Sequence, residues 1–193
     1  MNNTYFVLRH GQTPYQTEEK RGMTYPWPEY TPVPLTGEGI EEAKKAAKKI
    51  KEEGIDLIYS SDAFRTKKTA EIVAEETDSS VILDKRLRDI NLGDFKGSPR
   101  ENFYLFFSSQ KERFSKAPLG GESWNDLKER MKGFLYDIDK KYKNKKILIV
   151  THGDPIWILE GISRNLSNEE LLEKRKKGLF PKTAEFRKLT FKK

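Results

Sequence analysis

Both histidines of the chain occur in the same local setting, after an apolar run and directly before a glycine. His10 follows residues 5–9 and His152 follows residues 147–151. Short apolar runs that end in a glycine predict buried β-strands, so each imidazole is expected at a strand end. Ligands of open α/β sheets bind outside the carboxyl ends of the strands. Two neighbouring strands would place both imidazoles in one pocket; the alternative is that each is a hydrogen-bonded structural residue.

Two arginines are expected beside these histidines. Arg9 precedes His10, and Arg65 lies at the start of the helix expected after the second strand, where backbone N–H groups also attract anions. Two guanidiniums, a helix end and two imidazoles suit a tetrahedral oxyanion, because arginine binds phosphate oxygens in pairs. The arginines would repel a divalent cation, and no Asp/Glu cluster has ligand spacing, so we predict no metal site.

The nucleophile that this pocket offers is histidine. The chain contains no cysteine, and no serine stands in a nucleophile-elbow motif. Histidine is therefore the best nucleophile available for covalent catalysis.

Apolar patterning predicts alternating strands and helices. Strands are expected at residues 5–8, 57–59, 81–83, 147–150 and 183–191. Helices are expected from Thr36 to Gly54, from Ser61 or Asp62 as N-cap to Thr77, from Pro99 to Phe107, from Ser123 to Ile138, and at 155–162 and 168–176. The alternation predicts an α/β fold, a three-layer α/β/α sandwich with a mostly parallel sheet. We expect one domain over residues 1–193, with a small helical, aromatic cap inserted at about 96–121.

Composition narrows the class of protein. The 193 residues suffice for one domain, and no apolar run is long enough to span a membrane. We expect a cytoplasmic protein without a membrane or nucleic-acid partner. The net charge of +7 arises largely from lysine runs mixed with glutamates, which are typical of solvated helix faces. A positive field would still attract an anionic substrate.

Six short segments follow one another along the chain. They are residues 8–13 (LRHGQT), 34–39 (PLTGEG), 59–66 (YSSDAFRT), 87–97 (LRDINLGDFKG), 120–123 (GGES) and 151–153 (THG). The ordered set resembles the motifs of the histidine phosphatase superfamily, in its phosphoglycerate mutase-like branch. The resemblance implies a metal-independent phosphomonoesterase of broad-specificity type, which acts on a small phosphorylated substrate without a cofactor.

The resemblance also implies roles for individual residues. His10 would attack phosphorus and become phosphohistidine, while Arg9, Arg65 and His152 hold the phosphoryl oxygens. Asp89 would protonate the leaving alcohol and then deprotonate the attacking water, which requires a pKa raised by burial beside the phosphate. His10 must be neutral, so a hydrogen bond from its other ring nitrogen to backbone is expected. Further substrate-binding residues would be Gln12, Thr13, Gln16, Glu122 and Gly153.

Several of these assignments compete with structural ones. Asp89 stands where the family usually has glutamate, and Glu122 is the rival acid. Asp89 could instead cap a loop, and Glu122 could be an N-terminal helix charge. Thr13 could bond only local backbone, and Asp154 is expected in a turn or at an N-cap.

Two aromatic segments are expected near the pocket. Residues 23–34, which include Tyr25, Trp27 and Tyr30, exceed the family pattern and are expected at the pocket rim. The aromatic residues of 103–114 are too dense for one helical face, so they either cover the site or pack in the core.

Two other functions share this pattern. A phosphoglycerate mutase has the same core but must exclude water, and the mutases of the family have longer insertions and a C-terminal lid. A non-catalytic phosphate-binding or scaffold protein arises when the catalytic histidine is lost, whereas both histidines are present here.

Overall fold

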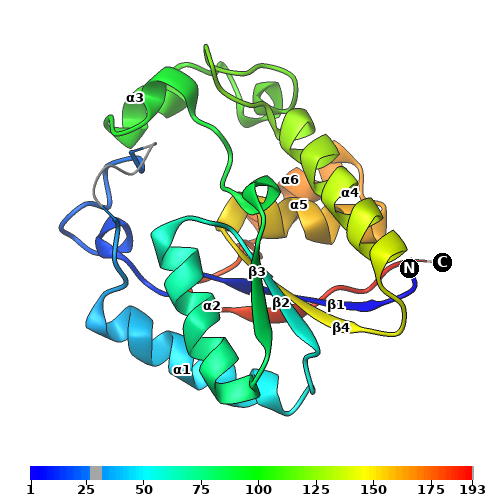
Figure 1. The fold of residues 1–193 in the computed structure, drawn as a ribbon. Helices are drawn as coiled ribbons and strands as arrows, with labels where there is room; N and C mark the ends of the chain where they lie inside the picture. The colour runs from blue at the N-terminus through cyan, green and yellow to red at the C-terminus, as the bar shows by residue number, and fades with distance from the viewer. Residues whose placement is uncertain (27–31, 193) are drawn as a thin grey trace.

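A single mixed sheet forms the centre of the molecule (Figure 1). The computed structural model describes residues 1–26 and 32–192. In these residues the strands are β1 (Thr4–Arg9), β2 (Leu57–Ser60), β3 (Ser80–Leu83), β4 (Lys146–Thr151) and β5 (Phe186–Lys188), in the order β3-β2-β4-β1-β5. β1 to β4 are parallel, and β5 is antiparallel to β1. The predicted fold class, a three-layer sandwich with a mostly parallel sheet, is confirmed.

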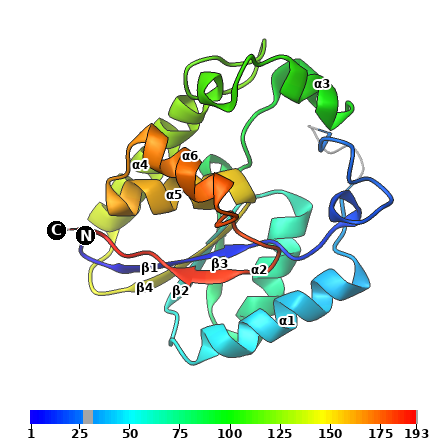
Figure 2. The ribbon, with the colours of Figure 1, turned by 180° about the vertical axis from the view of Figure 1, so that it is seen from behind.

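Helices cover both faces of the sheet (Figures 1 and 2). One face carries α1 (Gly37–Lys51) and α2 (Phe64–Thr77), and the other carries α4 (Trp124–Lys141), α5 (Gly153–Arg164) and α6 (Asn168–Lys176). Successive strand residues point to opposite faces. Tyr5 and Val7 therefore pack in the core under α4 and α5, whereas Phe6 and Leu8 pack against α1 and α2.

Several predicted helix starts are confirmed, and the predicted start of α2 is wrong. Thr36 caps α1 by accepting a hydrogen bond from the backbone N–H of Gly39, and Ser123 forms a capping box at the start of α4. The N-cap of α2 is Ala63 rather than Ser61 or Asp62. Asp62 instead binds the guanidinium of Arg88, so its carboxylate is used across the fold and not at its own helix.

The last strand is shorter than the alternation predicted. Residues 183–191 were expected to be extended, but β5 covers only Phe186–Lys188. Ala184 has φ of 48°, which is left-handed backbone and interrupts an extended strand. Its backbone N–H donates instead to the carbonyl of His10, so this turn lies against the end of β1.

The register of β1 and β4 brings the two histidines together. Arg9 pairs with Thr151 at the ends of these parallel neighbours, and the backbone N–H of His10 donates to the carbonyl of Thr151 at 3.0 Å. Because both strands end at the same edge of the sheet, His10 and His152 lie side by side at that edge.

Residues 96–121, here called the cap segment, contain α3 (Arg100–Leu105) and a 3-10 turn at Gln110–Phe114. Other single turns occur at Pro14–Gln16, Lys85–Leu87 and Gly93–Phe95. An isolated β-bridge joins Met23 to Pro99, so residues 22–26 lie against the start of the cap segment. Trp27 and Tyr30, expected at the pocket rim, lie outside the described residues.

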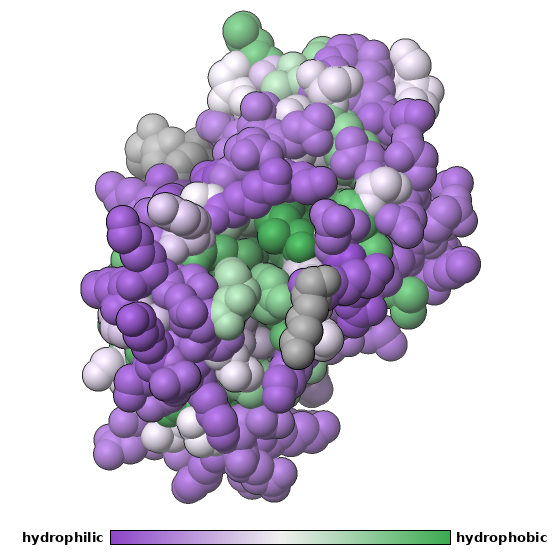
Figure 3. All heavy atoms as spheres, turned by 90° about the vertical axis from the view of Figure 1, so that its right-hand side faces the viewer, coloured by the Kyte–Doolittle hydropathy of each residue, from purple (hydrophilic) through white to green (hydrophobic). Residues whose placement is uncertain are grey.

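Hydrophilic residues dominate one face of the molecule, around a smaller group of apolar residues near its centre (Figure 3). Figure 3 views the end of the sheet where both termini lie, and charged or polar residues cover most of that face. Among residues 1–26 and 32–192, no helix is long and apolar enough to cross a membrane.

Candidate active site

A cavity of about 470 Å³ lies outside the carboxyl ends of β1 and β4. Its lining includes strand-end residues Arg9 and His152, Arg65 from the first turn of α2, and Asp89 from the loop after β3. Arg100 and Arg113 of the cap segment also line it. A cavity therefore lies at the strand ends, as predicted, and segments from across the whole chain line it; of the two histidines, only His152 is part of that lining.

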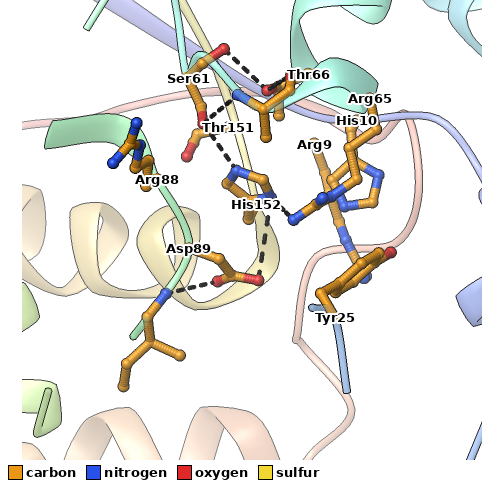
Figure 4. Close-up of polar contacts among 12 residues, drawn as sticks. Arg9, His10, Tyr25, Ser61, Arg65, Thr66, Arg88, Asp89, Thr151 and His152 are labelled. Carbon is orange, nitrogen blue, oxygen red and sulfur yellow. Dashed lines mark hydrogen bonds and ion pairs between the residues drawn. The ribbon is translucent and has the colours of Figure 1, made fainter. Parts of the chain in front are cut away.

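His10 lies directly behind this lining. Its ring is 1% exposed, and its centroid is 5.4 Å from that of His152 and 6.3 Å from that of Tyr25. The Tyr25 ring lies over the guanidinium of Arg65, at 3.8 Å from its central carbon (Figure 4). His10, Arg9, Arg65 and His152 thus form one compact group beside Tyr25.

The tautomer of His10 follows from its backbone contact. Its Nδ1 lies 2.8 Å from the carbonyl oxygen of Gly11, which can only accept, so Nδ1 carries the proton. The expected tautomer-fixing bond is confirmed. Burial, then the positive charges of Arg65 and Arg9, hold the pKa of His10 well below its ordinary value. The ring is neutral at physiological pH, with the Nε2 lone pair free to attack an electrophile.

His152 is oriented from both sides. Its Nδ1 accepts a hydrogen bond from the Arg65 guanidinium at 3.2 Å, so Nε2 carries the proton and donates to the Ser61 hydroxyl at 3.0 Å (Figure 4). Burial, then the charge of Arg65, keeps the pKa of His152 well below normal. Nδ1 therefore faces the Arg65 guanidinium and serves as a hydrogen-bond acceptor for it.

Asp89 is the acid nearest to this group. One carboxyl oxygen lies 4.0 Å from Nδ1 of His152, and the other accepts from the backbone N–H of Ile90 at 3.0 Å. Burial, then the negative charge of Asp154, raises the pKa of Asp89 to about 6, against the opposing charges of Arg65 and Arg9. The raised pKa was expected to need a bound phosphate; burial and Asp154 produce it without one.

Glu122, the rival acid, is already bound to a cation. Arg130 of α4 donates to both of its carboxylate oxygens, at 2.8 and 2.7 Å, and the backbone N–H of Asn91 donates to one of them. A bidentate arginine pair is a strong charge-assisted contact that occupies both carboxylate oxygens. Arg130 also donates to the carbonyls of Arg88 and Asp89, so it holds the Asp89 loop in place.

The remaining predicted binding residues occupy different places. Gln16 and Gly153 line the cavity, whereas Gln12 and Thr13 do not. The Gln12 side chain accepts from the Thr36 hydroxyl, and Thr13 caps the turn at Pro14–Gln16 while bonding Gln16 and the Tyr25 hydroxyl. Gln12 and Thr13 therefore bond neighbouring residues of the site, namely Thr36, Gln16 and Tyr25, and do not line the cavity.

Some aromatic residues of the cap segment cover the site and others pack in the core, so both of the expected placements occur. Phe103 and Tyr104 line the cavity, while Phe114 packs in the core at 4.9 Å from the Trp124 ring. Asp154 lies in the first turn of α5, after His152 as N-cap, so the expected N-cap position is off by two residues. Its carboxylate accepts from Trp124 and pairs with Arg175.

Comparison with known proteins identifies the fold and the family. A family model described as histidine phosphatase superfamily (branch 1) matches residues 5–176. The chain belongs to this superfamily. It is 34% identical over 160 residues to phosphoglycerate mutase-like protein 4 of Arabidopsis thaliana, covering 78% of this chain and 66% of that protein. It is 32% identical to a probable phosphoglycerate mutase, GpmB, of Escherichia fergusonii, covering 77% and 68% of the two chains.

A solved histidine phosphatase fold superposes on nearly the whole chain. The mycobacterial glucosyl-3-phosphoglycerate phosphatase complexed with VO3 has a TM-score of 0.80, 24% identity and coverage of 96% of this chain and 90% of that one. At this identity the likeness is one of fold. The chain spans about two thirds of the length of its two mutase-named relatives.

The site contains cations that the sequence motifs did not indicate. Arg130, Arg113 and Arg100 line the cavity from α4 and the cap segment. Each is a single arginine in a charged stretch with no motif around it, so no sequence signal distinguished it from a surface residue. No cluster of three or more potential metal ligands occurs among residues 1–26 and 32–192.

Proposed function

We propose that this histidine phosphatase is a metal-independent phosphomonoesterase that hydrolyses a small phosphorylated metabolite through a phosphohistidine on His10. The observation that carries the proposal is the packing of neutral His10 against Arg9, Arg65 and His152. Such a group offers a nucleophile together with donors for the phosphoryl oxygens. A phosphate monoester is the ligand that these charges fit.

The first step transfers the phosphoryl group to the enzyme. Nε2 of His10 forms a bond to phosphorus while the phosphorus–oxygen bond of the ester breaks. The guanidiniums of Arg9 and Arg65 stabilise the charge on the equatorial oxygens, and His152 orients the Arg65 guanidinium through the hydrogen bond that its Nδ1 accepts. The Asp89 carboxyl, with a pKa of about 6, gives its proton to the departing alkoxide, so an alcohol leaves.

The second step returns the enzyme to its starting state. The Asp89 carboxylate removes a proton from a water molecule, whose oxygen attacks the phosphorus of phosphohistidine. Inorganic phosphate leaves, and both His10 and Asp89 regain their original protonation. Glu122 serves in neither step because Arg130 holds both of its oxygens.

The mutase-named relatives favour a second candidate, a phosphoglycerate mutase. A mutase would make the same phosphohistidine but return the phosphoryl group to a bound metabolite instead of water. Measurement of free phosphate against transferred phosphate decides between the two functions. A phosphate-binding scaffold would show neither product.

The test of the mechanism uses a phosphate ester labelled at phosphorus, with acid-labile and base-stable label counted on the protein after rapid quenching. The wild type should carry the label. His152→Ala should also carry it, formed more slowly, because this variant keeps His10 and loses only the residue bonded to Arg65. His10→Ala should carry none and should lose about a thousandfold or more in rate. Normal turnover by His10→Ala, or acid-labile label on the His10→Ala protein, would overturn the proposal.

A further inference from the structure

The outer part of the cavity is lined by arginines, and most of them have an acidic partner. Arg130 pairs with Glu122, Arg175 with Asp154 and Arg88 with Asp62. Arg113 is different: within residues 1–26 and 32–192, its guanidinium makes no hydrogen bond or ion pair with any side chain or carbonyl, and its Nε is buried without a partner.

Arg113 is also deeply buried. The residue is 5% exposed and stands in the 3-10 turn of the cap segment at Gln110–Phe114. Its guanidinium carbon lies 3.9 Å from the ring centre of Trp124 and 4.9 Å from that of Phe103. These rings hold a planar cation in one orientation, but they accept no hydrogen bonds along its edge.

The position of Arg113 connects it to the proposed catalytic group. Trp124, on which it stacks, donates its indole N–H to Asp154, two residues after His152. Burial lowers the pKa of Arg113, and the charges of Asp154 and Asp89 oppose this effect. The guanidinium thus lies within electrostatic reach of the acid beside His152.

A buried charge without a partner is costly, and a guanidinium stays charged throughout the physiological range. The cation is therefore balanced best when an anion enters the cavity. The phosphate attacked by His10 would be bound by Arg9 and Arg65 at the strand ends, whereas Arg113 stands in the cap segment and lies on Trp124 and Phe103. Arg113 is therefore placed to bind a different anionic group. Arg100 lines the same cavity and has a buried Nε without a partner, although its other end donates to the carbonyl of Met23.

We propose that Arg113 is a specificity-determining residue that binds a second anionic group of the substrate, remote from the phosphate that His10 attacks. This rests on the proposed phosphomonoesterase function and narrows its substrates to phosphate esters whose alcohol carries a carboxylate or a second phosphate. A cavity of about 470 Å³ accommodates a small metabolite with both groups. The aromatic wall of Phe103 and Trp124 fixes the cation before the substrate arrives.

The test compares substrates that differ only in the second anion. 3-Phosphoglycerate and glycerol 3-phosphate differ in one carboxylate, and 1,3-propanediol bisphosphate and 3-hydroxypropyl phosphate differ in one phosphate. For the wild type, kcat/KM should be about tenfold or more higher for the anionic member of at least one pair, as expected for a charge-assisted hydrogen bond. Which pair shows the preference identifies the anion as carboxylate or phosphate.

The variants separate charge from packing. Arg113→Met keeps an apolar side chain on Trp124 and should lose the preference, with turnover of the single-anion substrates within about threefold of the wild type. Arg113→Gln serves the same comparison if the methionine variant does not fold, and Arg113→Lys should retain part of the preference. Lys111→Met is the matched control: it removes one cation from the same turn, where Lys111 is exposed, pairs with Glu169 and does not line the cavity.

Calorimetric binding of the same four compounds to the His10→Ala protein gives a second readout that needs no turnover. A preference that survives Arg113→Met in binding or in kcat/KM, or a wild type without preference in either pair, would overturn the role of Arg113. Absence of phosphate release from every ester would overturn the proposed function instead, and the binding comparison would still decide the role of Arg113.

Discussion

The acid in this site is selected by its surroundings. Asp89 and Glu122 both line the cavity, but only Glu122 is held by a bidentate arginine. Asp89 faces His152 at 4.0 Å, and loss of water contact in the cavity wall, then the negative charge of Asp154, raises its pKa to about 6 although its side chain is only partly buried. A carboxyl with this pKa keeps a protonated fraction near neutral pH and can donate a proton to a leaving group.

Asp89→Asn should discriminate between leaving groups. Turnover of p-nitrophenyl phosphate should change little because nitrophenolate leaves without a proton, whereas turnover of ethyl phosphate should fall about a hundredfold or more. In the wild type, kcat/KM for ethyl phosphate should decrease as pH rises above about 6, because the donor loses its proton there. The variant should lack this part of the decrease, while the ionisation of the substrate itself remains in both proteins.

Steady-state rates on the two esters across pH 5–8 provide the measurement, and Glu122→Gln provides the matched comparison. Equal losses on both esters in Asp89→Asn would remove Asp89 from the role of proton donor. A selective loss on ethyl phosphate in Glu122→Gln would assign that role to Glu122.

At the scale of elements, the loop after β1 is held against the first turn of α1 by backbone contact. A Cβ on Gly11 would lie 2.3 Å from the carbonyl oxygen of Gly39, and a Cβ on Gly39 would lie 2.1 Å from the carbonyl oxygen of Gln12. Backbone atoms cannot move aside as a flexible side chain can. Both glycines are therefore needed for the close approach that positions His10 at the strand end.

Gly39→Ala should lower the free energy of unfolding by about 1–3 kcal/mol, the usual cost of overpacking, and should reduce turnover because the His10 loop is displaced. Gly37→Ala is the control in the same helical turn, since a Cβ at Gly37 meets nothing within 4 Å. It should leave the protein as stable or slightly more stable, because alanine favours helix. Urea unfolding of both variants measures the difference; equal stabilities would show that the loop and α1 separate easily.

At the scale of the whole molecule, positive charge is concentrated where a phosphate would bind. The chain carries a net charge of +7, and Arg9, Arg65, Arg100 and Arg113 all line one cavity. In other phosphoryl-transfer enzymes a divalent cation neutralises the charge that develops on the phosphoryl oxygens. Here the guanidiniums of Arg9 and Arg65, at the strand ends and beside His10, are placed to do so.

Phosphatase activity should therefore survive exhaustive chelation. The protein is dialysed against a strong chelator, its metal content is measured, and turnover of p-nitrophenyl phosphate is compared with and without added Mg²⁺. Rates should agree within about twofold. Loss of activity on chelation, with rescue by a divalent ion, would show that a metal takes part and would contradict the metal-independent mechanism.

The sequence by itself determined the elements and the position of the two histidines. Apolar runs that end in His-Gly specify buried parallel strands, and the neighbouring strands β1 and β4 bring His10 and His152 together. Helix starts with a hydroxyl N-cap, such as Thr36 and Ser123, were likewise readable because capping depends on residues close in the chain. The end of β5 could not be predicted from the sequence, because the turn at Ala184 depends on a hydrogen bond to the carbonyl of His10, which is distant in the chain.

Only the tertiary structure decided which charged groups are paired and which are free. Glu122 is bound through Arg130, the Asp89 pKa depends on Asp154, and Arg113 lies on Trp124 without an acid. The partners in these contacts come from different segments, and no local pattern brings them together. Electrostatic energies depend on distance and burial, which packing sets, so a linear sequence specifies the groups but not their ionisation.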